Sequence, residues 1–180
     1  MKAVIVAAGL SFRLRPLTDE LPKGLLDVGE TSILERAVTN LEATGHDDIA
    51  VVVGFRRHQI QECLGSRVRY VYNPFYETTN NMASLWFALQ ASESEPFTYG
   101  HGDLVYTERL LRDFIEGATG SEIALSVDFG PTDEEAMKVA VVDGRFRESN
   151  KQIPLDEAVG EWTGLARFSK CGSEATKDQI

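Results

Sequence analysis

The 180-residue sequence predicts an α/β fold, with a parallel, doubly wound sheet over its first two-thirds and a small antiparallel appendage near its carboxyl end. Three observations lead to this prediction. Short apolar runs rich in β-branched residues recur along the chain, helical patterns lie between them, and the last third has strand and turn patterns without long helices. The length suits one domain covering residues 1–180.

Apolar runs indicate where the strands lie. Continuous apolar runs occupy residues 2–7, 49–53, 68–71 and 122–127, and residues 96–100 resemble a further short strand. Strands that are apolar on both sides are typical of a sheet covered by helices on both faces. We therefore expect the first four of these runs to be buried on both faces.

Helices are expected between the strands, at residues 33–44, 57–64, 81–91 and 108–116. In the first helix, apolar residues recur at helical spacing from Ile33 to Leu41. Thr31 or Ser32 can cap its start, and Gly45 closes its end. Strands and helices thus alternate, and ligands of such a sheet bind at the carboxyl ends of its strands.

The final third changes character. Strand patterns cover residues 137–142, residues from 146 onward and residues 161–168, with the turn Asp143-Gly144 between the first two. These strands predict the antiparallel appendage. Residues 173–180 begin like a capped helix and stop after about two turns, so we expect a truncated carboxyl end.

Composition narrows the possible functions. The formal net charge of −10 repels polyanions, so nucleic acid and anionic lipid are not expected partners, and an anionic ligand needs a local basic cluster. The cysteines, Cys63 and Cys171, form neither a C-x-x-C pair nor a disulfide framework, which suits a reducing cytoplasm. No apolar run approaches the roughly 18 residues that span a bilayer, so we expect a cytoplasmic protein without a membrane span.

The connection after the first strand contains the most informative pattern. Pro16 and Pro22, with glycines on either side, prevent a helix from starting directly after the strand, and the spacing matches neither a G-x-G-x-x-G turn nor a P-loop. This connection runs from residue 8 to residue 32, and loops of such length in compact domains are usually functional or disordered. Arg13, Arg15 and Lys23 gather positive charge at a strand's carboxyl end, which predicts a polyphosphate site.

The motif Ala7-Ala8-Gly9-x-Ser11-x-Arg13 with Pro22-Lys23 resembles the signature of the nucleotidyltransferase family that includes sugar-phosphate nucleotidyltransferases and phosphocholine cytidylyltransferases. The similarity extends through residues 72–76, 80–85, 102–103 and 161–164. The double asparagine at 80–81 is similar to the phosphocholine, aminoethylphosphonate and inositol-phosphate cytidylyltransferases. At Ser11 many members have glycine, and Phe12 replaces a small hydroxyl residue.

The resemblance implies a Rossmann-like, doubly wound mixed sheet of the nucleotide-diphospho-sugar transferase type. It also implies that a loop containing Ala7, Ala8, Gly9 and Ser11 wraps a nucleoside triphosphate. Arg13 then lies on the β- and γ-phosphates, and Lys23 bridges the reacting phosphates. These roles fit the chemistry, because transfer at an α-phosphate needs positioning and charge neutralisation more than a protein nucleophile.

Asp103 is the expected magnesium ligand. It follows the strand at 96–100 at the sheet edge that also bears the Gly9 loop, and Mg²⁺ is usually held by one or two carboxylates together with phosphate oxygens. A turn aspartate is the alternative, and the resemblance favours the metal. His101 is treated as a neighbour. Members of this family usually supply a second metal-binding carboxylate near the carboxyl end, and Asp178 is the candidate for it here. If Asp178 does not serve, either the chain is incomplete or the domain binds nucleotide but transfers it poorly.

The base and the acceptor have separate candidates. The resemblance assigns Asn80, Asn81 and Ser84 to cytosine recognition, although helix capping explains one asparagine and uracil stays open. The acceptor candidates are Lys138 for its phosphate, Glu161 for a cationic head group, and the aromatic residues Tyr76, Trp86, Tyr99 and Trp162.

The sequence thus predicts an enzyme that transfers a nucleoside monophosphate, CMP from CTP, to a small phosphorylated or phosphonate acceptor such as phosphocholine, releasing pyrophosphate with Mg²⁺. Two alternatives remain: a sugar-1-phosphate nucleotidyltransferase, and a catalytically weak nucleotide-binding domain. The acceptor and the oligomeric state are not predicted.

Overall fold

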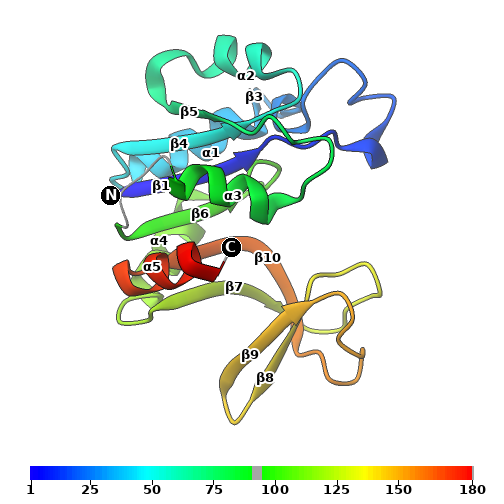
Figure 1. Ribbon diagram of the computed structural model, residues 1–180, viewed down its shortest axis with the longest axis vertical. Helices are drawn as coiled ribbons and strands as arrows, with labels where there is room; N and C mark the ends of the chain where they lie inside the picture. Colours follow the sequence, from blue (N-terminus) through cyan, green and yellow to red (C-terminus); the bar gives the residue numbers. More distant parts are fainter. Residues whose placement is uncertain (91–94, 180) are drawn as a thin grey trace.

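The computed structural model describes residues 1–90 and 95–179, and it contains one large mixed sheet flanked by helices (Figure 1). The sheet order is β5-β4-β1-β6-β10-β8-β9, and β7 also pairs with β10. The strands of the sheet are β1 (Lys2–Ala7), β4 (Asp48–Val53), β5 (Arg69–Tyr72), β6 (Phe97–His101), β7 (Ile123–Phe129), β8 (Lys138–Val142), β9 (Arg145–Asn150) and β10 (Gly160–Phe168). The helices are α1 (Ile33–Ala43), α2 (Arg57–Leu64), α3 (Asn81–Gln90), α4 (Glu108–Gly117) and α5 (Lys170–Gln179).

The amino-terminal half is parallel and doubly wound. β1 lies between β4 and β6, and β5 pairs with β4, all in parallel. Alternate residues of β1 enter two different cores: Ala3 and Ile5 pack with α1, α2 and α4, whereas Val4 and Val6 pack with α3. The predicted α/β fold is therefore confirmed, with helices on both faces of the parallel strands.

The carboxyl-terminal third is antiparallel, as expected. β10 pairs with β6, β7 and β8, each in the antiparallel sense, and β8 and β9 form a hairpin. The hairpin turns at Asp143 and Gly144, both of which have positive φ, as a two-residue turn of this kind requires. In Figure 1 this hairpin projects from the end of the sheet that lies farthest from β5.

Two of the predicted strands are less buried than expected. The prediction for 68–71 was wrong about burial, because β5 is an edge strand and only Val71 within it is buried. The prediction for 122–127 was wrong for a different reason: β7 is antiparallel, and none of its residues is fully buried. An apolar run alone does not distinguish a strand covered on both faces from an edge or antiparallel strand.

Helix boundaries follow local capping. Ser32 caps α1 in a capping box with Glu35, and Gly45 follows its end at φ +84°. The last helix begins at Lys170 rather than at residue 173, because the Ser169 hydroxyl accepts the Gly172 N–H at 3.1 Å. Ala91, expected in the third helix, lies outside the described residues. None of the described helices is long and apolar enough to cross a membrane.

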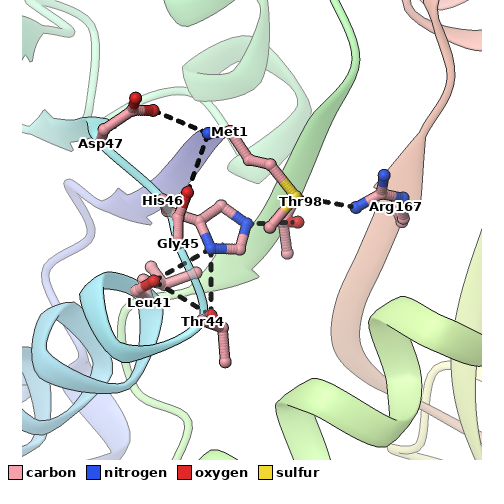
Figure 2. A network of polar contacts seen from close by, with 8 residues as sticks. All are labelled: Met1, Leu41, Thr44, Gly45, His46, Asp47, Thr98 and Arg167. Atoms are coloured by element: carbon pink, nitrogen blue, oxygen red, sulfur yellow. Dashed lines mark hydrogen bonds and ion pairs between the residues drawn. The ribbon is translucent and has the colours of Figure 1, made fainter.

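A polar network ties the sheet together at the end opposite the Gly9 loop (Figure 2). The buried His46 ring contacts the Leu41 carbonyl at 3.1 Å through Nδ1 and the Thr98 hydroxyl at 2.9 Å through Nε2. The Met1 ammonium donates to the Gly45 carbonyl and pairs with Asp47 at 2.7 Å. The network joins the end of α1 to β1 and β6, and burial lowers the pKa of His46.

Candidate functional site

A cleft lies at the carboxyl ends of β1 and β6, where the alternating strands and helices predict a ligand site. Its empty volume is about 420 Å³. Its walls come from β1, the loop after it, the turn at residues 23–25, the start of α3 and the residues after β6. The lining residues are Val6, Ala7, Gly9, Ser11, Lys23, Gly24, Asn81, His101, Gly102 and Asp103.

Glycines let the loops of the cleft approach each other closely. The Gly102 N–H donates to the Val6 carbonyl at 2.8 Å, and a Cβ atom on Gly102 would lie 2.7 Å from the Ala7 Cβ. A Cβ atom on Gly24 would lie 2.7 Å from the Gly102 carbonyl oxygen. Gly9 differs, because no protein atom lies within 4 Å of the position where its Cβ would be. Backbone packing fixes the cleft floor, while Gly9 leaves space above it.

Lys23 and Asp103, each predicted as a site residue, form a charged pair in this cleft. Lys23 Nζ lies 2.6 Å from Asp103 Oδ2, and both side chains are about one-third exposed, at 31% and 37%. An ammonium can neutralise phosphate oxygens, and a carboxylate can face a cation. The cleft therefore has groups that suit an anionic ligand bound together with a cation.

Arg13 lies outside the cleft. Arg13 is exposed on a short 3₁₀ turn (Phe12–Leu14) and is not among the lining residues. Ser11 adopts a left-handed conformation with φ 53°, and its carbonyl accepts a hydrogen bond from the buried Thr18 hydroxyl at 2.9 Å. The glycine of many similar sequences reaches this conformation without steric cost, so serine here is compatible with the same loop shape.

The neighbouring residues Asn80 and Asn81 make different contacts in the structure. The Asn80 carboxamide accepts the N–H groups of Met82 and Ala83 and so caps α3. Asn81 lines the cleft, and its Nδ2 lies 3.2 Å from His101 Nε2. Ser84 is only 3% exposed, and its hydroxyl accepts a hydrogen bond from Asn73, so the structure does not bring Ser84 to the cleft. Ala8 is also buried, and its carbonyl accepts the Phe55 N–H.

His101 was not predicted as a site residue, yet it lies at the centre of the site. It ends β6, and its ring makes edge contacts with Tyr99 and Trp162 at centroid distances of 5.5 and 5.1 Å. Burial lowers the pKa of His101, the charge of Asp103 acts in the opposite direction, and the charge of Lys23 adds to the lowering. Its position directly before Gly102-Asp103 was the available sequence signal.

A second, larger cavity adjoins the cleft on the side of β10. Its empty volume is about 1250 Å³, and its lining combines α3 and α5 with β6, β7, β9 and β10. The lining residues are Asn80, Asn81, Met82, Leu85, Tyr99, His101, Leu125, Met137, Phe146, Ser149, Trp162, Ala166, Phe168 and Thr176. Most of these residues carried no motif, and the antiparallel pairing of distant strands brings them together.

The acceptor candidates fall in different places. Trp162 and Tyr99 line the second cavity, whereas Tyr76 and Trp86 do not. Glu161 is exposed outside its lining. Lys138 is buried at 2% exposure, and its ammonium donates to the carbonyls of the 133–134 loop, so its charge serves that loop in this structure.

The magnesium prediction rests on a small donor set. Within residues 1–90 and 95–179 there is no group of three or more His, Cys, Asp or Glu side chains that could hold a metal ion. Asp103 is the one carboxylate among the described residues of the cleft lining, and Asp178 lies exposed on α5, outside that lining. A single carboxylate fits an ion that takes its other ligands from phosphate oxygens and water.

Comparison with known sequences finds one matching domain family and several cytidylyltransferases. Residues 3–166 match the MobA-like NTP transferase domain. The choline-phosphate cytidylyltransferase of Streptococcus pneumoniae is 40% identical over 89 residues, which is 48% of this chain and 38% of that protein. The CTP:phosphoglutamine cytidylyltransferase of Campylobacter jejuni is 26% identical over 187 residues, covering 94% and 73%. The 2-aminoethylphosphonate cytidylyltransferase of Lancefieldella rimae is 34% identical over 108 residues, covering 59% and 44%. The chain thus spans less than half the length of two of these relatives.

Solved structures agree on the fold. The CTP:phosphocholine cytidylyltransferase from Streptococcus pneumoniae superposes with a TM-score of 0.74 at 24% identity, over 97% of this chain and 73% of that one. The inositol-1-phosphate CTP transferase from T. maritima gives the same TM-score and identity, over 98% and 74%. The resemblance predicted from the Gly9 loop is confirmed, and the chain belongs to the MobA-like NTP transferase domain family.

Proposed function

We propose that this chain is a nucleotidyltransferase that moves CMP from CTP to a small phosphorylated or phosphonate acceptor and releases pyrophosphate. One observation carries the proposal: Lys23 and Asp103, which come from loops after two neighbouring parallel strands, meet within 2.6 Å beside the Gly9 backbone. The family membership and the cytidylyltransferases among the relatives support it.

The reaction needs charge neutralisation around the triphosphate. An oxygen of the acceptor's phosphate or phosphonate group attacks the α-phosphorus, the bond from that phosphorus to the bridging oxygen breaks, and pyrophosphate leaves with the electron pair. Backbone N–H groups near Gly9 and Ser11 can approach the polyphosphate closely. The Lys23 ammonium offsets charge that develops on the reacting phosphates. Arg13 is the proposed contact for the β- and γ-phosphates, from an exposed position on the loop beside the cleft.

Asp103 is the residue that would hold Mg²⁺. When bound there together with the triphosphate, the ion would neutralise phosphate charge. Asp103 also pairs with Lys23, so it keeps the ammonium at the cleft floor. Both contributions of Asp103 depend on its negative charge.

CTP is the proposed donor, and Asn81 the proposed contact for its base. Asn80 is occupied as a helix cap, whereas Asn81 lines the cleft beside the Gly9 loop. Three of the similar proteins are named for cytidylyl transfer, which supports CTP over UTP.

The proposed acceptors come from two classes of phosphorylated or phosphonate compound. Phosphocholine, aminoethylphosphonate and inositol phosphate follow from the names of the relatives. A sugar 1-phosphate is the second candidate, because the N-acetylmuramate alpha-1-phosphate uridylyltransferase of Neisseria meningitidis is 34% identical over 113 residues. Trp162 and Tyr99 in the adjoining cavity favour a head group that packs on aromatic rings.

A matrix of substrates tests the proposal. CTP, UTP, ATP and GTP are each combined with phosphocholine, aminoethylphosphonate, inositol phosphate and glucose 1-phosphate, and initial pyrophosphate release is measured with Mg²⁺. The expected result is release with CTP and one of the first three acceptors. Preference for UTP with glucose 1-phosphate would support the sugar alternative, and triphosphate binding without release in any combination would support the nucleotide-binding alternative.

A further inference from the structure

The cleft and the second cavity meet at two residues. Among the described residues, only Asn81 and His101 belong to the lining of both spaces. The cleft holds the charged pair of Lys23 and Asp103, whereas no Asp, Glu, Lys or Arg lines the described part of the second cavity. A triphosphate suits the first space and an acceptor body suits the second. The two substrates would therefore meet beside Asn81 and His101.

The His101 ring is fixed in place from several sides. Tyr99 and Trp162 contact its edges, and the Trp162 indole N–H donates to the Leu165 carbonyl at 3.0 Å, which fixes that ring in turn. The strand β10 is irregular between Trp162 and Ala166 and passes His101 at Gly164, where φ is +94°. A Cβ atom on Gly164 would lie 2.6 Å from His101 Nδ1. Only glycine therefore allows both this backbone and this ring position.

The fixed ring in turn contacts a side chain that would otherwise be mobile. Asn81 is exposed at the first position of α3, and its neighbour Asn80 already caps the helix. The Asn81 carboxamide is thus free of capping duty, and its contact at 3.2 Å with His101 Nε2 joins the start of α3 to the end of β6. Restricting an exposed carboxamide to one rotamer prepares it for a ligand.

We infer that His101 is a positioning residue, which holds the Asn81 carboxamide at the junction so that the acceptor phosphate and the nucleotide meet in a reactive geometry. Gly164 contributes to this positioning, because it leaves room for the His101 ring. The inference rests on the proposed function for its effect on turnover. It also makes a structural claim that does not need turnover, namely that Asn81 loses its order when His101 loses Nε2.

Two variants separate positioning from packing. His101→Phe keeps an aromatic ring against Tyr99 and Trp162 but has no nitrogen for Asn81, whereas His101→Gln keeps a polar partner without the ring. His58→Phe, at an exposed position of α2, is the matched control. With CTP and the best acceptor, His101→Phe is expected to lower kcat/KM for the acceptor by roughly tenfold to a hundredfold, as misplacement by about 1 Å can do. His101→Gln is expected to recover part of that loss. CTP binding should weaken in His101→Phe to about the same extent as in Asn81→Ala, because Asn81 is the proposed contact for the base.

A double-mutant cycle and a spectrum complete the test. Asn81→Ala combined with His101→Phe should cost little more than either alone, because both break one contact. The side-chain amide signals of Asn81 in a ¹⁵N NMR spectrum should shift and lose order in His101→Phe, with thermal melting to confirm folding. Independent, multiplicative effects on turnover, or unchanged Asn81 signals, would overturn the inference. Absence of turnover in the wild type would instead overturn the proposed function, and the NMR comparison would still decide the positioning.

Discussion

The ammonium of Lys23 lies 2.6 Å from the carboxylate of Asp103, although 80 residues separate them in the chain. The carboxyl ends of the adjacent strands β1 and β6 bring their loops together and so make this pair possible. Both side chains remain partly exposed, and such pairs contribute little to stability, about 0–1 kcal/mol. The pair therefore matters for the chemistry of the cleft rather than for the stability of the fold. Its two residues are the first targets for mutagenesis.

Lys23→Ala should reduce turnover more than nucleotide affinity. The lysine charge matters most when negative charge builds up on the reacting phosphates, so kcat should fall by about 100-fold or more, while the dissociation constant for CTP changes far less. Initial rates and equilibrium CTP binding measure the two effects separately. An unchanged kcat would refute the assigned role of Lys23.

Asp103→Asn should leave the protein folded and nearly abolish Mg²⁺-dependent pyrophosphate release. Asparagine keeps the shape and one carbonyl oxygen but loses the charge that faces both Lys23 and a divalent ion. The measurement is the initial rate against Mg²⁺ concentration, with thermal melting as a folding check and Asp178→Asn as the control. Wild-type activity with an unchanged Mg²⁺ midpoint would contradict the metal role, because asparagine serves a turn as well as aspartate does.

Arg13→Ala should weaken triphosphate binding without affecting stability, since Arg13 is exposed and lies outside the cleft lining in this structure. The expected loss is about tenfold in CTP affinity, with a smaller loss for CMP, because a guanidinium binds two phosphate oxygens at once. Arg109→Ala is a suitable control, because Arg109 is an exposed arginine on α4 that pairs with Asp113 at 3.7 Å, outside this loop. Equal losses for CTP and CMP would count against a β/γ-phosphate contact.

The buried His46 should make stability depend on pH. Its folded-state pKa lies below its ordinary value of about 6.5, so the unfolded chain takes up the proton first as the pH falls. Stability should therefore be greatest above about pH 6.5 and decline below it, by up to about 1.4 kcal/mol per pH unit, until the folded-state pKa is reached. Chemical unfolding at pH 7.5 and at lower pH measures this decline.

The matching variant is His46→Gln. It should be less stable than the wild type near pH 7, because the contacts to Leu41 and Thr98 are lost, and should show a smaller pH dependence. His58→Gln, on the exposed side of α2, should keep the wild-type dependence. If wild type and His46→Gln decline in parallel, a different group accounts for the acid sensitivity.

Gly102→Ala should disrupt the cleft floor. The added methyl group would lie 2.7 Å from the Ala7 Cβ and 3.0 Å from the Val6 carbonyl oxygen, so the two strand ends must separate. A loss of about 1–3 kcal/mol in unfolding free energy and of most activity is expected. Gly117→Ala, where no atom lies within 4 Å, is the control. Full activity in Gly102→Ala would show that the close packing is not needed.

The sequence predicted the parts of the site that follow from strand order. Lys23 and Asp103 were both expected at one sheet edge because parallel strands present their carboxyl ends together, and the structure brings them into contact. The roles assigned to Ser84 and Lys138 came from motif position or residue type, and neither reveals which way a side chain faces. Both are buried and bonded to the protein itself.

The second cavity could not be predicted for another reason. Its walls depend on the antiparallel register of β7 to β10, which pairs residues from distant parts of the chain. An apolar period shows that Leu125 or Phe146 belongs to a strand, but it does not show which strand lies beside it. His101 was treated only as a neighbour of the site for a similar reason, because its contact with Asn81 and its close approach to Gly164 involve two other elements.

The strand β10 has a consequence for how such proteins diversify. It pairs with β6 through residues 165–168 and with β8 at Gly160 and Glu161, and its irregular segment lies between these two stretches. Met137, Phe146 and Ser149 of the second cavity come from the β8–β9 hairpin or from the residue before it, beyond that irregular segment. Substitutions in the hairpin could therefore reshape the proposed acceptor cavity while the parallel strands around the Gly9 cleft keep their register. A single fold could in this way acquire new acceptors by changing one hairpin, without rebuilding its nucleotide cleft.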